Sequence, residues 1–247
     1  MAELVPPPPA LSTTDSLFLD FDGTLVELAE RPDAVVVAPS LVDMLDRLAA
    51  TMPGRVAIVS GRSIAQLDAM LGPQARHFAL AGSHGAERRT PEHGYESPEP
   101  PEALALAAES LRDYADTNGL VFEAKSFGAA IHYRQRPELE DDANAAAAAV
   151  ADTHGLVLQR GKMMAEVRLS GDKGDAILGL LETSAMQGTR PLFFGDDVTD
   201  EDGFVAAAAS GGAGVLIGPL RETAALYRLE SVSALHTWIA AAMEARA

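Results

Sequence analysis

The most constraining feature of the sequence is the stretch 17–25, in which an apolar run leads into two aspartates and a glycine. The apolar run predicts a buried strand. Asp20 and Asp22 follow it two residues apart, so in an extended chain their side chains point to the same side. Gly23 allows a sharp exit or a close approach of the backbone to a ligand. Because open α/β sheets bind ligands at the carboxyl ends of their strands, this stretch predicts a site for a hard cation and a phosphate.

The rest of the chain alternates short apolar runs with segments that carry apolar residues at helical spacing. The apolar runs predict strands over residues 17–21, 56–59, 78–81, 191–194 and 214–218. Strands that alternate with helices are typical of a parallel sheet. We therefore expect an α/β protein with a Rossmann-like parallel-sheet core.

Residues 96–170 break this alternation. Two helical segments, near 101–117 and 137–153, are each followed by two short runs of alternating polar and apolar residues. Helix–strand–strand occurs twice, which predicts an inserted, smaller α+β cap domain with an antiparallel sheet. A stretch at 90–101, rich in proline, glutamate and glycine, indicates a linker. The expected division is a flexible, proline-rich tail, a core in two parts and a cap: residues 1–16, 17–95 with 171–247, and 96–170.

Composition excludes several classes of function. The chain has no cysteine, so disulfides, thiolate nucleophiles and cysteine-based zinc sites are excluded. Its net charge of −17 argues against binding to nucleic acid or to an anionic membrane surface. No apolar run approaches the ~18 residues of a membrane span, and the N-terminus lacks the pattern of a signal peptide. We expect a cytoplasmic protein without nucleic-acid or membrane partners, and a monomer is the working hypothesis.

A second acidic cluster follows another predicted strand. Asp196, Asp197 and Asp200 come directly after the apolar run 191–194. Aspartates at the end of a single strand can serve merely to cap a turn. Two acidic strand ends that meet at one sheet edge, however, repel each other unless a cation lies between them. Mg²⁺ suits such a site because it takes oxygen ligands, keeps several waters and bridges to phosphate.

Two further features complete a phosphate site. Lys173 lies at a predicted helix start, where the helix dipole disfavours a cation, so we expect its partner to be a phosphate or a carboxylate. Ser60 and Gly61 offer a hydroxyl and flexible amides just before a helix, an arrangement that binds anions. The set predicts phosphoryl transfer. One aspartate attacks phosphorus to give an aspartyl phosphate, a second carboxyl protonates the leaving oxygen and later activates water, and Lys173 with Mg²⁺ neutralises charge.

The stretch 20–25 resembles the first motif of the haloacid dehalogenase superfamily of phosphatases. Ser60, Lys173 and the stretch 195–200 match its second, third and fourth motifs in order. The resemblance implies Asp20 as nucleophile and Asp22 as general acid and base.

The same resemblance implies how the other motif residues act. Mg²⁺ would be held by Asp20, the main-chain carbonyl of Asp22, and Asp196. Ser60 and Lys173 would hold the phosphoryl oxygens. One of Asp197 and Asp200 would orient a metal-bound water or Lys173.

A narrower resemblance, to the trehalose-6-phosphate phosphatase family, covers nearly the whole chain after residue 16. It depends on the stretches 60–62, 81–87, 123–125, 131–134, 162–168 and 195–201. It implies a sugar-phosphate substrate, trehalose 6-phosphate, in trehalose biosynthesis. The residues that it implies as contacts to the sugar are Arg62 and His84 in the core, and Glu123, Lys125, Arg134 and Glu166 in the cap. A sheet face that carries both acidic and basic side chains can bind sugar hydroxyl groups. The same pattern also occurs on the solvated face of a half-buried sheet.

Other functions stay open at this point. The same superfamily includes phosphatases with other sugar-phosphate substrates, such as sucrose-phosphate phosphatase. A serine hydrolase could use Ser83, Asp196 and His236, because 81–85 loosely resembles a nucleophile elbow, but it would leave Lys173 without a role. A nucleotide-sugar glycosyltransferase and a non-catalytic sugar-phosphate-binding module are further alternatives.

Overall fold

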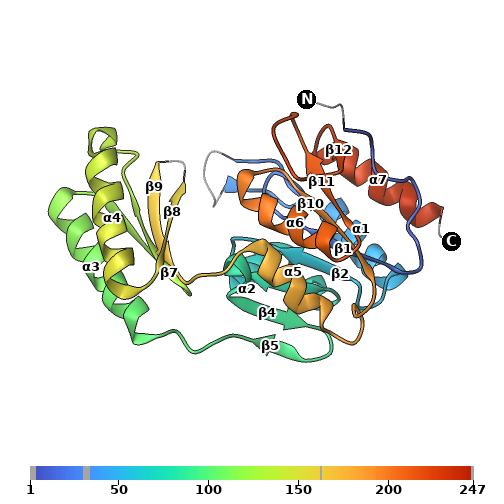
Figure 1. Ribbon diagram of the computed structural model, residues 1–247, viewed down its shortest axis with the longest axis horizontal. Helices are drawn as coiled ribbons and strands as arrows, with labels where there is room; N and C mark the ends of the chain where they lie inside the picture. The colour runs from blue at the N-terminus through green and yellow to red at the C-terminus, as the bar shows by residue number, and fades with distance from the viewer. Residues whose placement is uncertain (1–3, 30–33, 162, 246–247) are drawn as a thin grey trace. The chain divides into compact units, whose positions relative to one another are not determined.

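The computed structural model describes residues 4–29, 34–161 and 163–245 (Figure 1). The chain divides into two compact units. The first consists of Met1–Glu96 and Gly171–Ala247, and the second of Ser97–Ser170. The expected fold class, an α/β core with an inserted smaller α+β domain, is confirmed.

The first unit is built on an eight-stranded sheet in the order β12-β11-β10-β1-β2-β3-β4-β5. The strands from β12 to β3 are parallel, and β4 and β5 are antiparallel additions at one edge. The strands are β1 (Asp15–Leu19), β2 (Val56–Val59), β3 (Ala79–Gly82), β4 (Glu87–Thr90), β5 (Gly94–Glu96), β10 (Arg190–Gly195), β11 (Ala213–Ile217) and β12 (Tyr227–Leu229).

Helices cover both faces of this sheet. They are α1 (Pro39–Thr51), α2 (Ile64–Leu71), α5 (Lys173–Leu181), α6 (Glu201–Ala209) and α7 (Val232–Glu244). Leu17 and Leu19 of β1 pack in one core with α1, α2 and α7, whereas Phe18 packs in a second core with α5 and α6. Because successive side chains of a strand point to opposite faces, the part of a strand that packs against helices on both faces is apolar at successive positions. This explains the unbroken apolar run before Asp20.

The segment 90–101, expected as a linker, is in part a hairpin. β4 pairs with β3, and β5 pairs with β4. Arg89 of β4 donates to both carboxylate oxygens of Asp68, at 2.6 and 2.7 Å. These edge strands are short and polar, so they lack the apolar run by which the central strands were recognised.

The expectation of a loose tail over residues 1–16 does not hold for its described part. Leu11 is buried in the core, and Asp15 already belongs to β1. Trp238 Nε1 donates to the carbonyl of Pro8 at 2.9 Å, and Val5 pairs with Tyr227 at the edge strand β12. The proline-rich composition indicates an extended chain, but it does not show that this chain covers a sheet edge. Residues 1–3 lie outside the described residues.

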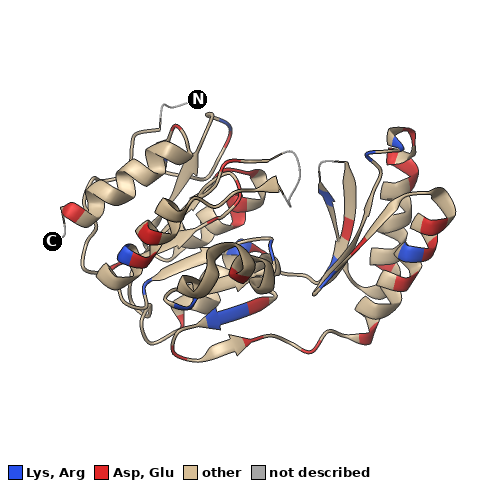
Figure 2. Cartoon of the chain, turned by 180° about the vertical axis from the view of Figure 1, so that it is seen from behind, with Lys and Arg blue, Asp and Glu red and all other residues tan. Residues whose placement is uncertain are grey.

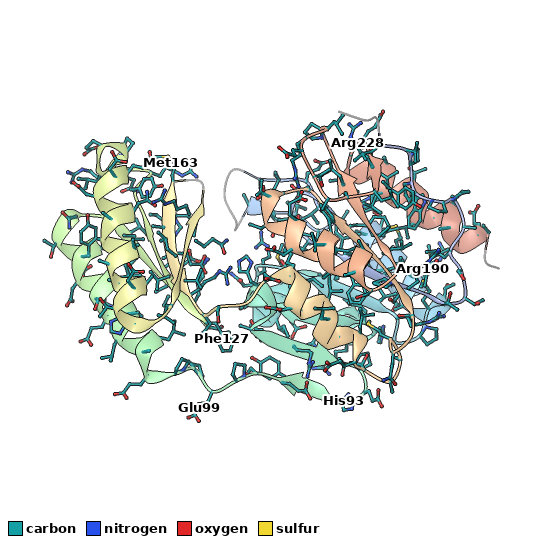
Figure 3. All side chains as sticks on the ribbon, viewed as in Figure 1. His93, Glu99, Phe127, Met163, Arg190 and Arg228 are labelled. Carbon is teal, nitrogen blue, oxygen red and sulfur yellow. The ribbon has the colours of Figure 1, made fainter. Side chains whose placement is uncertain are left out.

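The second unit is a four-stranded antiparallel sheet in the order β6-β7-β9-β8, with two helices packed on one face. Its elements are α3 (Glu102–Asn118), β6 (Val121–Lys125), β7 (Gly128–His132), α4 (Glu140–His154), β8 (Val157–Gly161) and β9 (Met164–Arg168). Both helices end at a left-handed glycine, Gly119 or Gly155. Figure 3 shows Phe127 and Met163 at opposite ends of this sheet, in its two hairpin turns.

Acidic residues outnumber basic ones by 36 to 19. Figure 2 shows the acidic residues over both units, including the helices of the second. Within the described part of the chain, no helix combines the length and the apolar character that crossing a membrane requires.

Candidate active site

The carboxyl ends of β1 and β10 bring three aspartates together. The two strands are parallel neighbours, and Asp20 follows one while Asp196 follows the other. The amide of Asp20 donates to the carbonyl of Phe194 at 2.9 Å, which continues the pairing beyond the last residue of β1. Carboxylate oxygens of Asp20, Asp196 and Asp200 lie within 4.8 Å of one another. Asp20 of the first acidic cluster and two aspartates of the second therefore form one site.

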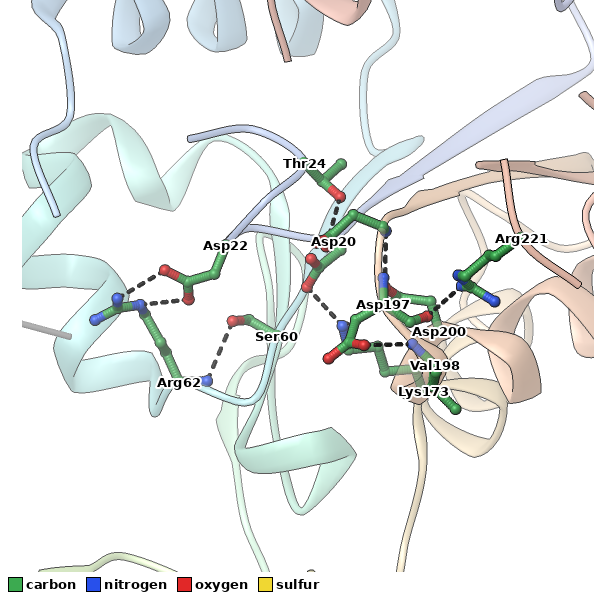
Figure 4. A network of polar contacts seen from close by, with 11 residues as sticks. Asp20, Asp22, Thr24, Ser60, Arg62, Lys173, Asp197, Val198, Asp200 and Arg221 are labelled. Atoms are coloured by element: carbon green, nitrogen blue, oxygen red, sulfur yellow. Dashed lines mark hydrogen bonds and ion pairs between the residues drawn. The ribbon is translucent and has the colours of Figure 1, made fainter. Parts of the chain in front are cut away.

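Lys173 is the cation of this site. It opens α5, and its Nζ donates to Asp20 Oδ1 and to Asp200 Oδ1, both at 2.6 Å (Figure 4). The side chains are buried: Lys173 is 5% exposed, Asp20 5% and Asp200 0%. Burial by itself lowers the pKa of Lys173, but the two neighbouring carboxylates more than offset this and raise it. The lysine is therefore a fixed positive charge, and its unfavourable place at a helix start is offset by carboxylate partners.

Asp200 uses both of its oxygens to organise the site. Oδ1 contacts Lys173, and Oδ2 accepts from the amides of Asp196 and Asp197, both at 2.9 Å. Asp197 caps the short turn that follows, with its Oδ1 2.6 Å from the amide of Val198. Arg221 Nη2 donates to the carbonyl of Asp197 at 2.6 Å (Figure 4). The loop after β10 is thus held from both sides.

The remaining negative charge fits a divalent cation. Burial raises the pKa of Asp20 well above its usual value, against the lowering effect of Lys173. Burial, together with the nearby Asp200, raises the pKa of Asp196 to about 6. Because one lysine faces three carboxyls, a cation bound near Asp20 and Asp196 would relieve this repulsion. Carboxylate oxygens are the ligands that Mg²⁺ prefers, so the donor set fits that ion.

Gly23 allows the turn after β1 to pass close to this cluster. Its φ is +84°, and a Cβ built there would lie 2.1 Å from Asp196 Oδ2. A side chain at this position would displace the carboxylate. The glycine is therefore required both by the backbone conformation and by the proximity of Asp196.

Asp22 lies apart from the three aspartates. Its carboxylate is bound by Arg62 through two parallel hydrogen bonds, from Nε at 2.6 Å and from Nη2 at 2.7 Å (Figure 4). The guanidinium also lies 5.8 Å from the centre of the Phe21 ring. From the sequence we expected Arg62 to contact the sugar. The pair with Asp22 was missed, because no spacing rule links residues on two different strand-end loops.

Ser60, Gly61 and His84 meet at the ends of β2 and β3. Ser60 is buried, and its Oγ accepts from the amide of Arg62 at 3.1 Å. The amide of His84 donates to the carbonyl of Ser60 at 3.1 Å. The imidazole of His84 lies over Gly61, where a Cβ would be 2.8 Å from the ring. These three predicted residues are therefore neighbours in the first unit.

Three of the predicted cap residues, Glu123, Lys125 and Glu166, lie on the second unit's sheet, on the face opposite the helices. Glu123 and Glu166 align in register with Ala130 and Gln159 in one row across the four strands. Lys125 pairs with Glu166. Small residues on β7, Gly128 and Ala130, form the middle of this face.

The fourth predicted cap residue does not lie on this sheet. Arg134 follows β7 in an exposed turn. Two further polar residues on the open face were not singled out from the sequence. His132 contacts Glu123 at 2.8 Å, and Arg168 donates to Gln159 at 2.6 Å. The period of two along a strand could have identified both, since it places them on the same face as Glu123 and Glu166.

Comparisons with known proteins identify the same family over nearly the whole chain. A family model described as trehalose-phosphatase matches residues 18–233. The trehalose-6-phosphate phosphatase of Escherichia coli (strain K12) is 37% identical over 243 residues, which cover 97% of this chain and 90% of that protein. A probable trehalose-phosphate phosphatase of Sinorhizobium fredii is 38% identical over 231 residues, 92% of this chain and 86% of that one.

Solved structures share the fold. The C-terminal domain of the Candida albicans trehalose-6-phosphate phosphatase superposes with a TM-score of 0.78 at 21% identity, covering 94% of this chain and 93% of that chain. A phosphatase of the haloalkanoate (HAD) superfamily from Bacteroides thetaiotaomicron gives 0.64 at 15% identity, covering 93% and 94%. The chain therefore belongs to the trehalose-phosphatase family and is a phosphatase with the fold of the haloacid dehalogenase superfamily.

Proposed function

We propose that this phosphatase hydrolyses trehalose 6-phosphate to trehalose and inorganic phosphate, with Mg²⁺, in the biosynthesis of trehalose. The observation that carries the chemistry is the buried contact of Lys173 with Asp20 and Asp200, beside Asp196. The similarity to trehalose-phosphate phosphatases over nearly the whole chain supports the substrate. We further propose a cytoplasmic, monomeric enzyme. The absence of cysteine supports the location, and sedimentation would test the monomer.

In the first half of the proposed reaction, a carboxylate oxygen of Asp20 attacks phosphorus and the bond from phosphorus to the sugar oxygen breaks. Asp22 gives its proton to that oxygen, so the sugar leaves as a neutral alcohol and an aspartyl phosphate remains. Lys173 orients Asp20 through the 2.6 Å contact, and Ser60 offers its hydroxyl to the phosphoryl oxygens. When bound by Asp20, Asp196 and the Asp22 carbonyl, Mg²⁺ would supply positive charge to the transferring group.

In the second half, Asp22 takes a proton from water, and the water oxygen attacks phosphorus. The bond between Asp20 and phosphorus breaks, so inorganic phosphate is released and the Asp20 carboxylate is restored. We assign Arg62 as a positioning residue here, because its two hydrogen bonds fix the direction of the Asp22 carboxylate. A lysine at this position could not make the same paired contact.

Recognition of the sugar is proposed for Arg62 and His84 in the first unit and for four residues of the second, Glu123, Lys125, Arg134 and Glu166. Carboxylates accept hydrogen bonds and lysine or arginine donate them, so a face that carries both kinds can bind hydroxyl groups in either sense. Sucrose 6-phosphate or another sugar phosphate remains the alternative substrate, because the three aspartates and Lys173 contact only the phosphoryl end.

The serine hydrolase alternative lacks its central contact. Ser83 Oγ donates to Glu87 at 2.7 Å, whereas His236 Nε2 contacts the carbonyl of Leu25 at 2.9 Å. The serine and the histidine that this alternative needs are therefore engaged with other groups.

Phosphate release with Mg²⁺ over four substrates tests the proposal: trehalose 6-phosphate, sucrose 6-phosphate, glucose 6-phosphate and mannose 6-phosphate. We expect the highest kcat/KM for trehalose 6-phosphate, and loss of activity when a chelator is added and regain when Mg²⁺ is restored. A higher kcat/KM for sucrose 6-phosphate would favour the alternative substrate. Full activity in the chelator, after dialysis against it, would contradict the metal assignment.

A further inference from the structure

Glu87 is a buried carboxylate to which the proposed reaction gives no role. It lies on β4 and is 3% exposed. Its carboxylate accepts three hydrogen bonds: Oε1 from the amide of Ile64 at 3.1 Å and from Ser83 Oγ at 2.7 Å, and Oε2 from Tyr95 Oη at 3.0 Å. A buried carboxylate with this many donors is firmly held in one orientation.

The donors to Oε1 belong to two different strand-end loops. Ile64 is the first residue of α2, directly after the loop 60–63 that carries Ser60. Ser83 is the neighbour of His84 in the turn after β3. A single oxygen atom of Glu87 therefore joins the loop proposed to bind the phosphoryl group to the loop proposed to bind the sugar. Tyr95, on the adjacent strand β5, holds the other oxygen.

The two loops also contact each other directly. The amide of Ser83 donates to the carbonyl of Arg62 at 2.8 Å. Ser83 and His84 both have left-handed backbone conformations, with φ of 51° and 57°. Residues other than glycine adopt such conformations when the surrounding structure imposes them. Glu87 is well placed to impose this one, because it binds the side chain of the first strained residue.

We propose that Glu87 is a positioning residue that clamps the loops 60–63 and 83–85 together, so that Ser60 and His84 keep a fixed separation at the active site. It does so by accepting hydrogen bonds, and its negative charge is not required. The inference rests on the proposed roles of Ser60 and His84.

The first test compares two substitutions of Glu87 with a matched control. Glu87→Ala removes all three acceptor contacts. Glu87→Gln keeps the shape: its Oε1 can accept from Ile64 and Ser83, and its amide can donate to Tyr95 Oη. The control is Asp15→Ala. Asp15 is 1% exposed and bound by Arg190 at 2.8 and 3.2 Å and by the Ser12 amide at 2.7 Å, but it lies at the opposite end of β1 from Asp20.

We expect Glu87→Ala to lower kcat/KM for trehalose 6-phosphate by about 100-fold, as misplaced binding groups do. Rates are measured per folded molecule, well below the thermal midpoint of each variant. Glu87→Gln should stay within about threefold of the unchanged enzyme, and so should Asp15→Ala even if it lowers the midpoint as much as Glu87→Ala does. An inactive Glu87→Gln would overturn the inference by showing that the charge matters. Equal losses in Glu87→Ala and Asp15→Ala would overturn it by showing a general effect of stability.

Ser83→Ala tests the link between the loops even if Glu87→Ala fails to fold. It removes the Ser83 hydroxyl and leaves the contact of Glu87 with Ile64 intact. We expect kcat/KM to fall about 10-fold for trehalose 6-phosphate and to change less than about twofold for p-nitrophenyl phosphate, which has no sugar to contact His84. No change for either substrate, or equal losses for both, would contradict the clamp.

The same assays separate this inference from the proposed function. If the unchanged enzyme hydrolyses p-nitrophenyl phosphate but not trehalose 6-phosphate, the proposed substrate is wrong. The clamp is then tested by the Glu87→Ala and Glu87→Gln pair on p-nitrophenyl phosphate, because Ser60 is proposed to contact the phosphoryl group of any substrate. If trehalose 6-phosphate is hydrolysed and Glu87→Ala behaves as Asp15→Ala does, only the clamp is wrong.

Discussion

Lys173 and Lys125 each pair with carboxylates, but in very different surroundings. Lys173 is 5% exposed, between Asp20 and Asp200, at a sheet edge with helices on both faces. Lys125 is 30% exposed and pairs with Glu166, which is 6% exposed, on a sheet that has helices on one face only. Charges held in a buried site act strongly on a reacting group and need not reorganise. Groups on a half-open face can exchange water or a neighbour for a sugar hydroxyl at small net cost. The difference therefore separates a part suited to chemistry from a part suited to recognition.

The largest expected effect comes from Asp20→Asn. We expect kcat to fall at least about 1,000-fold with every phosphate ester, because the amide cannot act as nucleophile. Burial raises the pKa of Asp20, so the charged carboxylate is disfavoured in the folded protein. Without added metal, the neutral variant should consequently unfold at a temperature equal to or above that of the unchanged protein.

Phosphate release and a thermal melt measure both properties of Asp20→Asn. Activity close to that of the unchanged enzyme would refute the nucleophile. A large fall in the melting temperature would show that Asp20 serves the fold more than the reaction.

Replacing each lysine by methionine compares the two surroundings directly. Lys173→Met leaves two buried carboxylates without their cation, which we expect to cost roughly 3–5 kcal/mol of unfolding free energy. Lys125→Met leaves one buried carboxylate, that of Glu166, without its cation, for which we expect a smaller loss of about 1–3 kcal/mol. Urea unfolding of the two variants gives both values. Similar losses would mean that neither the burial of the lysine nor the number of carboxylates left unpaired sets the contribution to stability.

Glu166→Ala tests whether the second unit binds the sugar part of the substrate. We expect kcat/KM for trehalose 6-phosphate to fall roughly 10- to 100-fold, because hydrogen bonds to the substrate and the partner of Lys125 are lost together. Turnover of p-nitrophenyl phosphate should change by less than about threefold, since that substrate offers no hydroxyl groups. Equal losses on the two substrates would assign Glu166 to the chemistry instead.

The comparison also explains what could be predicted from the sequence. Asp20, Lys173 and Asp196 could be expected to meet, because the carboxyl ends of parallel strands share one edge and the strands are marked by apolar runs. Their roles stay predictions. The shared face of Glu123 and Glu166 could be predicted too, because side chains along a strand alternate between its two faces.

What could not be predicted depends on contacts between loops and on polar edge strands. The pair of Arg62 with Asp22 and the three contacts of Glu87 are set by side-chain conformations and turns, which no residue spacing encodes. β5 is polar and exposed at the edge of the sheet, so its residues resemble a linker. Leu11 packs into a core through a tertiary contact, and the proline-rich sequence before it gives no sign of that contact.

The smallest expected effect concerns Glu123 and His132 on the half-open face. The hydrogen bond from His132 is the main cause that lowers the pKa of Glu123 in the folded protein. A lowered folded pKa adds stability above the unfolded value near pH 4, and this stability is lost as the pH falls through the folded pKa. His132→Ala should therefore reduce the free energy of unfolding by about 0.5 kcal/mol or less at pH 6, since the pair is partly exposed and solvent screens it. At pH 3 the variant and the unchanged protein should have nearly the same free energy of unfolding. Urea unfolding at both values measures this, and an equal difference at pH 3 and at pH 6 would show that His132 stabilises the sheet by packing and not through Glu123.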